Sequence, residues 1–262
     1  MKLISMITAL AIAATSAGAW EVDDLNDHIE QTNFIVANHC SGTLISTEHR
    51  LILTNDHCVS SFVRKEKKEV VDGNGFITDK MVEVRKEVPV SQKIYNKHKL
   101  VSQSSYISEI VDFDSENDLA VLQLRQEKIP QTRAAKIFNG DRVFRGEVAY
   151  AIGNPMMLDA SVTKGIISNV NRLLLVGGEE RPYFQMDAGI VGGSSGGSLY
   201  NDNGELIGVP AAAARGTSVG LAIPYYIVQE FLSKNCFEEL WDEEAESYEE
   251  CSKPEEESET EE

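Results

Sequence analysis

The chain has 262 residues, of which 42% are hydrophobic and 25% are charged. That composition can bury a sizeable core and excludes a wholly disordered or collagen-like chain, and the length fits one large domain or two small ones. The formal net charge of -18, from 42 acidic and 24 basic residues, argues against a nucleic-acid partner, because binding a phosphate backbone needs a basic surface.

Residues 1–19 have the pattern of an export signal. Lys2 begins it, an apolar run follows over residues 3–14, and the A-x-A sequence at 17–19 has the form that signal peptidase cleaves. A membrane anchor is the alternative, but the run is too short to cross about 30 Å of hydrocarbon. We therefore expect a secreted or periplasmic protein, cleaved before Trp20, with no membrane association after cleavage.

The body of the chain, residues 20–235, contains many short apolar segments that predict strands. Each is bounded by Gly, Asn, Asp or Pro, the residues of turns. These segments cover residues 33–37, 41–45, 51–54, 119–124, 148–152, 162–170, 183–186, 205–209 and 218–223. Many evenly spaced strands predict an all-β fold with an antiparallel barrel architecture.

Helix periodicity is clear mainly at residues 225–234, where four apolar side chains share one face, so we expect one C-terminal helix. Residues 60–115 are polar, charged and irregular. The basic run at 64–68 within them is interpreted as a solvated loop rather than a binding patch.

Acidic residues are concentrated in residues 236–262, which hold 14 acidic residues and one Lys. Such a run repels itself, so we expect a solvated, disordered tail. Calcium binding and docking to a basic partner are the functional alternatives, and no ligand-loop spacing supports calcium binding.

Four cysteines in an exported chain suggest disulfides rather than a metal site, because no C-x-x-C or H-x-x-x-H spacing occurs. Three pairings are possible. We favour Cys40 with Cys58, which lie at the ends of two strand-like segments, and Cys236 with Cys251, which bracket the start of the tail. Neither a metal ion nor another cofactor is expected.

The stretch GSSGG at residues 193–197 carries the clearest chemical signal. A flexible linker is the alternative, but strand patterns lie on both sides of it. We expect a tight turn that presents Ser195 and directs backbone N–H groups at one point, since glycine permits the unusual dihedrals of such a turn. A serine hydroxyl needs a base to act as a nucleophile, and the base needs an orienting group.

The order of the candidate residues along the chain selects the scaffold. The stretch also fits the G-x-S-x-G elbow of α/β-hydrolases, which place their histidine after the serine, but no histidine follows Ser195. The Asp–His–Ser order of subtilisin would need an acid from the short N-terminal stretch, and no parallel βαβ pattern supports it. The order His–Asp–Ser, which belongs to a two-barrel scaffold, remains.

His57 is the best candidate base, because it follows an apolar strand and precedes Cys58, whose disulfide could fix it. The other histidines lie in polar stretches and are expected to have surface or packing roles. They are His28, His39, His49 and His98.

Asp118 is the best candidate for the orienting acid, because it immediately precedes the alternating run at 119–124. Asp112 and Asp114 lie nearby and are the alternatives. Asp56 adjoins the candidate base in the chain, but adjacent side chains in extended backbone point to opposite faces, so we do not expect it to orient the ring.

Three segments together resemble the triad segments of trypsin-like serine proteases, with the closest similarity to bacterial HtrA-type and related secreted endopeptidases without a PDZ domain. They are LTNDHC at 53–58, NDLAVL at 117–122 and GSSGG at 193–197. Supporting stretches follow in order, namely AIGNP at 151–155, VTKGIIS at 162–168, QMDA at 185–188, GELIG at 204–208 and GLAIP at 220–224. The resemblance covers about residues 34–232.

The resemblance implies two antiparallel six-stranded β-barrels, joined near residues 127–136, with the active site between them. It implies that His57 is the general base, that Asp118 orients its imidazole, and that Ser195 attacks a peptide carbonyl to form an acyl-enzyme. The backbone N–H groups of Gly193 and Ser195 would form the oxyanion hole, where one donor is worth about 3 kcal/mol. The implied partners are protein or peptide substrates, and the oligomeric state stays open.

Two departures from the family's pattern concern the loop before the nucleophile. Ser194 stands where trypsin-type zymogens have Asp, so an activation salt bridge to a new N-terminus cannot form, and we expect activity without that switch. Gly192 replaces a commoner Pro, which bears on the rigidity of the oxyanion loop. An acidic tail stands in place of the partner domain of HtrA-type enzymes, so their regulated assembly is not implied.

The residues of the specificity pocket are predicted only in part. Gly189 stands where the trypsin-like enzymes that cut after Lys or Arg have Asp, and glutamate-specific relatives place a histidine near Pro210, where this chain has none. With Ala211 and Ala212 in the same wall, we expect a pocket for a small or medium apolar side chain.

Two other functions fit parts of the sequence. One is a catalytically silent binding protein of the same fold, which a missing triad residue would usually reveal, and none is missing. The other is a secreted β-rich adhesion or ligand-binding module in which GSSGG is only a loop.

Overall fold

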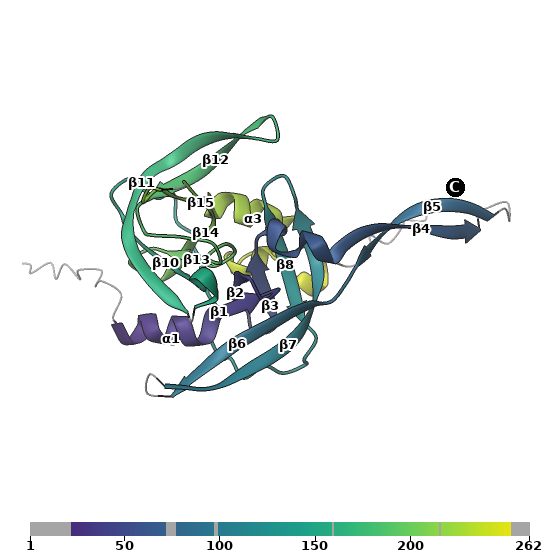
Figure 1. The fold of residues 1–262 in the computed structure, drawn as a ribbon, viewed down its shortest axis with the longest axis horizontal. Helices are drawn as coiled ribbons and strands as arrows, with labels where there is room; N and C mark the ends of the chain where they lie inside the picture. The colour runs from purple at the N-terminus through teal and green to yellow at the C-terminus, as the bar shows by residue number, and fades with distance from the viewer. Residues whose placement is uncertain (1–21, 72–76, 97–98, 159, 215, 253–262) are drawn as a thin grey trace, which may run out of the picture.

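The computed structural model describes residues 22–71, 77–96, 99–158, 160–214 and 216–252. The predicted export signal at residues 1–19 lies outside these residues. Strands form two β units, from which one two-stranded hairpin projects (Figure 1). Among the described helices, none has the length and apolar composition needed to cross a membrane.

The first unit is a closed barrel of six antiparallel strands in the order β1-β2-β3-β8-β7-β6. The ring closes where β1 pairs with β6. Its strands are β1 (Asn33–Val36), β2 (Cys40–Ser46), β3 (Leu51–Thr54), β6 (Val88–Asn96), β7 (Lys99–Asp114) and β8 (Leu119–Leu124).

The second unit is a ring of six antiparallel strands, closed because β13 pairs with both β10 and β14. Its strands are β10 (Val148–Gly153), β11 (Ser161–Val176), β12 (Glu179–Met186), β13 (Ser198–Tyr200), β14 (Glu205–Ala213) and β15 (Gly220–Pro224). A short strand, β9 (Lys136–Ile137), joins β14 in parallel. The predicted all-β fold of two six-stranded barrels is confirmed, with β9 as an extra strand.

The solid apolar runs of the sequence are explained by strands that are buried on both sides. In β3, Ile52 faces the core of the first barrel, whereas Leu51 and Leu53 belong to a second cluster shared by both barrels. In β8, Leu122 and Val121 divide in the same way. The period of two is therefore present, but both sets of side chains are apolar, and the shared cluster holds the barrels together.

The predicted C-terminal helix is α3 (Tyr225–Ser233), which buries one apolar face against the shared cluster. A second helix, α1 (Val22–Thr32), precedes the first barrel and was not predicted. Among its described side chains, Leu25 and Ile29 pack against the shared cluster, and the Thr32 hydroxyl lies 3.2 Å from Tyr200 Oη. Apolar residues at 22, 25 and 29 have the i, i+3, i+7 spacing of a helix face, so the sequence did contain a short helical pattern here.

The interpretation of residues 60–115 as irregular is wrong. A short helix α2 (Asp56–Val59) and the turn η1 (Ser60–Phe62) lead into the hairpin of β4 (Val63–Val71) and β5 (Ile77–Arg85), which extends from the body in Figure 1. The hairpin is mostly exposed, so no buried face imposes alternation on its sequence. Charged pairs across its strands, such as Lys67 Nζ with Asp79 Oδ2 at 2.5 Å, replace apolar packing.

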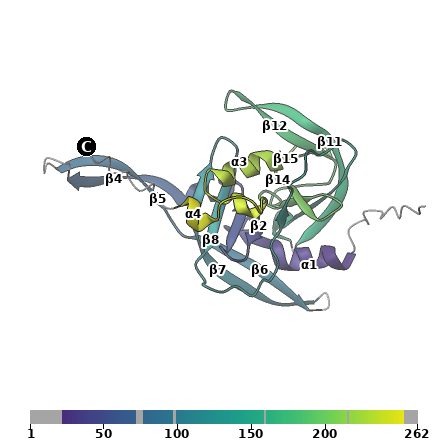
Figure 2. The same ribbon diagram turned by 180° about the vertical axis from the view of Figure 1, so that it is seen from behind.

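The expectation of a disordered tail does not hold for residues 236–252. These residues form the turn η3 (Glu238–Leu240) and the helix α4 (Tyr248–Cys251), drawn in yellow in Figure 2, and Cys236 is bonded to Cys251. Phe237 is buried, and its ring stacks on Tyr248 with centroids 4.9 Å apart. Apolar side chains within the acidic run thus anchor it, and residues 253–262 lie outside the described residues.

Candidate active site

Strand pairing brings the predicted base and acid together. Thr54, the last residue of β3, pairs with Ala120 in β8, so the residues after β3 lie beside the residues before β8. His57 follows β3 in α2, and Asp118 immediately precedes β8. Asp118 has a φ of 56°, a left-handed conformation that aspartate tolerates better than most residues.

The Asp118 carboxylate binds His57 at two points. Its Oδ1 accepts a hydrogen bond from the His57 backbone N–H at 2.9 Å, and its Oδ2 lies 2.8 Å from the ring Nδ1. The carboxylate therefore favours the tautomer with the proton on Nδ1, which leaves Nε2 free to accept a proton. The Asn55 side-chain amide donates to the Asp118 carbonyl at 2.8 Å and fixes the same turn.

The pKa of His57 is raised above its ordinary value of 6.5. The main cause is the hydrogen bond with Asp118, whose charge also favours the imidazolium, while burial acts in the opposite direction. The charge of Asp56 adds a smaller contribution that also raises the pKa. The site therefore stabilises the protonated form that a general base must reach.

The sequence predicts that Asp56 does not orient the His57 ring, and in the structure it does not. Its charge nevertheless contributes to the electrostatic environment of that ring. Its side chain is buried, and burial is the largest of the causes that raise its pKa above the ordinary value of 3.8. Oδ1 of Asp56 has no hydrogen-bond partner among the described residues. A partly satisfied buried carboxyl therefore lies next in sequence to the candidate base.

The GSSGG stretch forms the predicted tight turn. Gly193 and Gly196 have φ values of 96° and 80°. A Cβ on Gly193 would collide with the backbone of Asn154 and Met156, and one on Gly196 would meet Thr54. Both positions therefore require glycine, because the φ is left-handed and the neighbouring chain is too close.

The backbone of this turn leaves two N–H groups available as donors. In a planar trans peptide the C=O and N–H point in opposite directions. Gly192 O accepts from Met156 N–H at 2.7 Å, so the Gly193 N–H points away from Met156. Ser194 O accepts from Gly197 N–H at 3.1 Å, and neither the Gly193 nor the Ser195 N–H donates to another described residue.

The Ser195 side chain is oriented differently from the prediction. Its Oγ lies 3.4 Å from the Ala211 carbonyl, and it makes no hydrogen bond with His57 in the part of the chain that the structure describes. The Ser195 carbonyl nevertheless lies 3.9 Å from Cys58 Sγ, next to His57. The loop is thus in place beside the base, while the hydroxyl occupies a rotamer turned toward β14.

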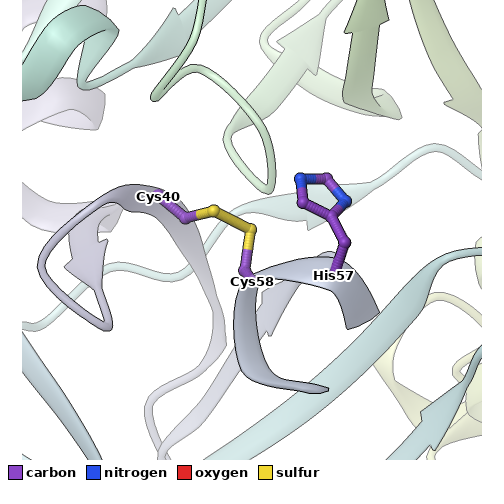
Figure 3. Close-up of side chains that lie close together, drawn as sticks. All are labelled: Cys40, His57 and Cys58. Carbon is purple, nitrogen blue, oxygen red and sulfur yellow. A yellow bond between two sulfur atoms is a disulfide. The ribbon is translucent and has the colours of Figure 1, made fainter. Parts of the chain in front are cut away.

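The disulfide Cys40–Cys58, one of the two pairings that the sequence favours, lies beside the base (Figure 3). A ring nitrogen of His57 and the two sulfurs lie within 4.8 Å of one another. Because both sulfurs are in a disulfide, they are not thiolates that could bind a metal ion. The bond instead ties the helix that carries the base to the start of β2.

A cavity of about 480 Å³ opens beside Ser195. Its walls include the predicted Pro210, Ala211 and Ala212, together with Val191. Gly189 does not line it, and its carbonyl accepts a hydrogen bond from Thr163 Oγ1 at 2.9 Å. None of the described lining residues carries a charge.

The other histidines and acids considered in the sequence lie outside this group or outside the described residues. His28 packs edge-on against Tyr200, His39 Nδ1 lies 2.7 Å from the Ala37 carbonyl, and His49 Nε2 lies 2.6 Å from Glu239. Asp112 accepts from the Asn235 side chain, and Asp114 accepts from two backbone N–H groups of the following turn. His98 lies outside the described residues.

One polar network at the site was not predicted. Ser41 Oγ donates to the Gly193 carbonyl at 2.7 Å and accepts from the Asn154 backbone N–H at 2.7 Å. Asn154 and Asn33 pair through their side-chain amides at 3.0 and 3.2 Å. The sequence offers no signal for this network, because the burial of Ser41 and Asn33 and their hydrogen-bond partners depend on how distant segments pack.

Comparison with known proteins matches the chain to serine endoproteases. Residues 40–209 match the family model described as a trypsin-like peptidase domain. A probable periplasmic serine endoprotease, DegP-like, of Chlamydia trachomatis is 37% identical over 170 residues, covering 62% of this chain and 33% of that protein. The periplasmic serine endoprotease DegP of Escherichia coli is 33% identical over 176 residues, covering 65% of this chain and 37% of that protein.

A solved structure is similar over a larger part of the chain. The crystal structure of the serine endoprotease from Yersinia pestis has a TM-score of 0.55 and 26% identity, and the alignment covers 80% of this chain and 65% of that one. The chain matches only about a third of the length of the curated relatives.

Proposed function

The chain belongs to the family of trypsin-like peptidase domains, and from that premise we propose that it is a serine endopeptidase that hydrolyses peptide bonds through His57, Asp118 and Ser195. The observation that carries the proposal is the two-point contact of Asp118 with His57, at 2.9 and 2.8 Å. That contact directs a basic nitrogen away from Asp118 and prepares the ring to be charged, as a general base requires.

The reaction begins with a rotation of the Ser195 side chain. A 3.4 Å contact to the Ala211 carbonyl is a weak hydrogen bond, so turning Oγ from it toward Nε2 of His57 has a small cost. Catalytic hydrogen bonds are often long or poorly aligned before substrate binds. Substrate entering the cavity beside Ala211 would compete for that carbonyl and favour the rotated hydroxyl.

In the acylation step, Ser195 Oγ bonds to the substrate carbonyl carbon and its proton passes to His57 Nε2. The carbonyl oxygen becomes an oxyanion, which accepts hydrogen bonds from the N–H groups of Gly193 and Ser195. His57 then gives its proton to the leaving amine as the C–N bond breaks, and an acyl-enzyme remains. Water then bonds to the acyl carbon while His57 takes its proton; the bond between that carbon and Ser195 Oγ breaks, His57 returns the proton to Oγ, and the carboxylic acid product leaves.

The cavity supports a preference for a small or medium apolar side chain before the cleaved bond. Pro210, Ala211 and Ala212 contribute apolar surface, and no described lining side chain offers a charge to pair with Lys, Arg or Glu. Arg215 lies between two lining residues in the sequence but outside the described residues. Cleavage of a peptide library that favoured Lys, Arg, Asp or Glu at this position would overturn the preference.

We also propose that the protein is exported and acts on proteins or peptides in the periplasm or outside the cell. The export pattern of residues 1–19 and the two disulfides support this location, because disulfides persist in oxidising compartments. Two curated relatives carry the word periplasmic in their names.

A fluorophosphonate probe tests the proposed activity, because it labels only a serine that a base activates. We expect labelling of the native protein and its loss in Ser195→Ala, with turnover falling by roughly 10⁶-fold. Ser168→Ala, which changes an exposed serine on β11, is the matched control and should keep the label. Absence of labelling in the native protein would favour the catalytically silent binding protein.

A further inference from the structure

We propose that Ser41 is a positioning residue that holds the oxyanion loop in its donor-presenting conformation. Ser41 lies in β2 of the first barrel, whereas the loop at 192–196 belongs to the second barrel. This inference rests on the proposed protease function and adds a residue that neither touches substrate nor belongs to the triad.

The loop needs such support because of its own sequence. Gly192 and Gly193 are adjacent, and glycine adopts positive and negative φ with similar ease, so the chain itself does not fix the plane of the peptide between them. Rotation of that plane would exchange the Gly193 N–H for the Gly192 carbonyl on the substrate side. The conformation must therefore be fixed by contacts from outside the loop.

Ser41 supplies two of these contacts, one to the carbonyl of each donor residue. Its hydroxyl donates to the Gly193 carbonyl at 2.7 Å, and its backbone N–H donates to the Ser195 carbonyl at 2.8 Å. The segment between those two carbonyls contains the Ser195 N–H, and the Gly193 N–H lies immediately before it. With Gly192 O bound to Met156 N–H, the peptide planes on both sides of the Gly193 Cα are fixed.

Ser41 is itself held in one orientation. Its side chain is fully buried, and Oγ accepts from the Asn154 backbone N–H at 2.7 Å while it donates to Gly193, so both roles of the hydroxyl are used. Its carbonyl accepts from Thr54 Oγ1 at 2.8 Å. The paired amides of Asn33 and Asn154 fix the next position in the network.

The neighbouring disulfide connects this network to the base. Cys40 immediately precedes Ser41, and Cys58 immediately follows His57 (Figure 3). The start of β2 therefore contacts the oxyanion loop through Ser41 and is covalently joined to α2 through Cys40. Groups from both barrels are held in register at this one point of the chain.

The test compares two variants of β2 that each lose a buried hydroxyl. Ser41→Ala removes the hydrogen bond to Gly193. Thr43, a residue that is 1% exposed, has a hydroxyl with no hydrogen-bond partner among the described residues, and Thr43→Val removes that hydroxyl. Loss of one oxyanion donor costs about 10²- to 10³-fold in turnover, so we expect Ser41→Ala to lower kcat by about 10- to 100-fold with KM within about twofold. Thr43→Val should keep both constants near those of the native protein.

Inhibitor binding separates a positioning role from general destabilisation. A peptide boronate forms a tetrahedral adduct that uses the oxyanion hole, whereas the same peptide with hydrogen in place of the boronate group puts no oxygen there, so Ser41→Ala should weaken only the boronate, by about the same factor as kcat. If Ser41→Ala does not fold, Asn33→Ala acts one contact further away and should show the same selective loss at a smaller size. An equal loss of both ligands, or a kcat in Ser41→Ala equal to that in Thr43→Val, would overturn the inference, whereas an inactive native protein would overturn the proposed function itself.

Discussion

The substitution Asp118→Asn tests whether the carboxylate at 118 sets the tautomer of His57, because the structure determines the orientation that the asparagine amide must adopt. Oδ1 of Asp118 accepts from the His57 backbone N–H at 2.9 Å, so the amide oxygen of an asparagine has to stay there. The amide NH₂ then faces the ring Nδ1, which at present lies 2.8 Å from Oδ2. A donor in that position requires Nδ1 without a proton and places the proton on Nε2, where it blocks proton uptake from Ser195.

The size of the loss follows from the contacts that change. The amide oxygen keeps the backbone N–H, so the change falls on the ring: its hydrogen bond to a charged group, which contributes about 1.5–3 kcal/mol, is lost, and the ring is held in the tautomer that cannot take a proton at Nε2. A loss of about 4 to 5.4 kcal/mol in the transition state corresponds to about 10³- to 10⁴-fold in kcat. The Asp118 side chain is 27% exposed, so solvent screens this bond only in part.

The assay is turnover of a fluorogenic peptide across a range of pH. In the native protein kcat/KM should rise with pH as the proton leaves His57, whose pKa lies above the ordinary 6.5 because of Asp118. In Asp118→Asn the carboxylate that raises this pKa is gone, so the acidic limb of the residual activity should move to lower pH. Asp112→Asn, which changes an acid bound to Asn235 and not to His57, should keep both rate and profile.

A loss below about 10-fold in Asp118→Asn, or an acidic limb that stays in place, would refute this reasoning. Either result would mean that the ring is oriented by groups other than the carboxylate at 118.

Two further substitutions test stability. Asp56→Asn should raise the unfolding temperature near neutral pH. The pKa of the buried Asp56 carboxyl is raised in the folded state, so its contribution to stability is present at pH below the ordinary pKa of 3.8 and is lost as the pH rises through the raised pKa. Near neutral pH the fold therefore holds a buried charge that asparagine does not carry. The gain should shrink as the pH falls, and equal unfolding temperatures at neutral pH would contradict it. Replacing Cys236 and Cys251 by serine opens a disulfide with a sequence separation of 15, and denaturant unfolding should show that the free energy of unfolding falls by about 3 kcal/mol. A fall in turnover larger than the fall in folded protein would count against a purely structural role for this disulfide.

The sequence predicted the strands whose side chains are apolar on both faces. β3 and β8 were identified from short apolar runs between turn residues, and their pairing places His57 and Asp118 together. Chain order alone selected the His–Asp–Ser arrangement, because the position of a histidine relative to a serine does not depend on contacts. The apolar runs are local patterns and the chain order is a property of the sequence itself, so both can be identified from a single sequence.

Apart from α1, the structures that were missed either leave no hydrophobic pattern in the sequence or depend on contacts between distant segments. The hairpin of β4 and β5 has little buried surface, so its pairing leaves no hydrophobic alternation to find. Ser41 looks like an ordinary strand residue until Gly193, 152 positions later, is placed against it. The rotamer of Ser195 depends in the same way on the Ala211 carbonyl, which pattern analysis cannot position.

The loop contacts also bear on how the site becomes active. Trypsin-type zymogens order this loop when a new N-terminal ammonium reaches an Asp beside the nucleophile, and Ser194 offers no carboxylate for that purpose. Here Gly192 O and Gly193 O are bound by Met156 N–H and the Ser41 hydroxyl, groups that the two barrels supply as soon as they pack. The energy that orders the loop therefore comes from folding itself, so we expect donors to be presented without proteolytic activation.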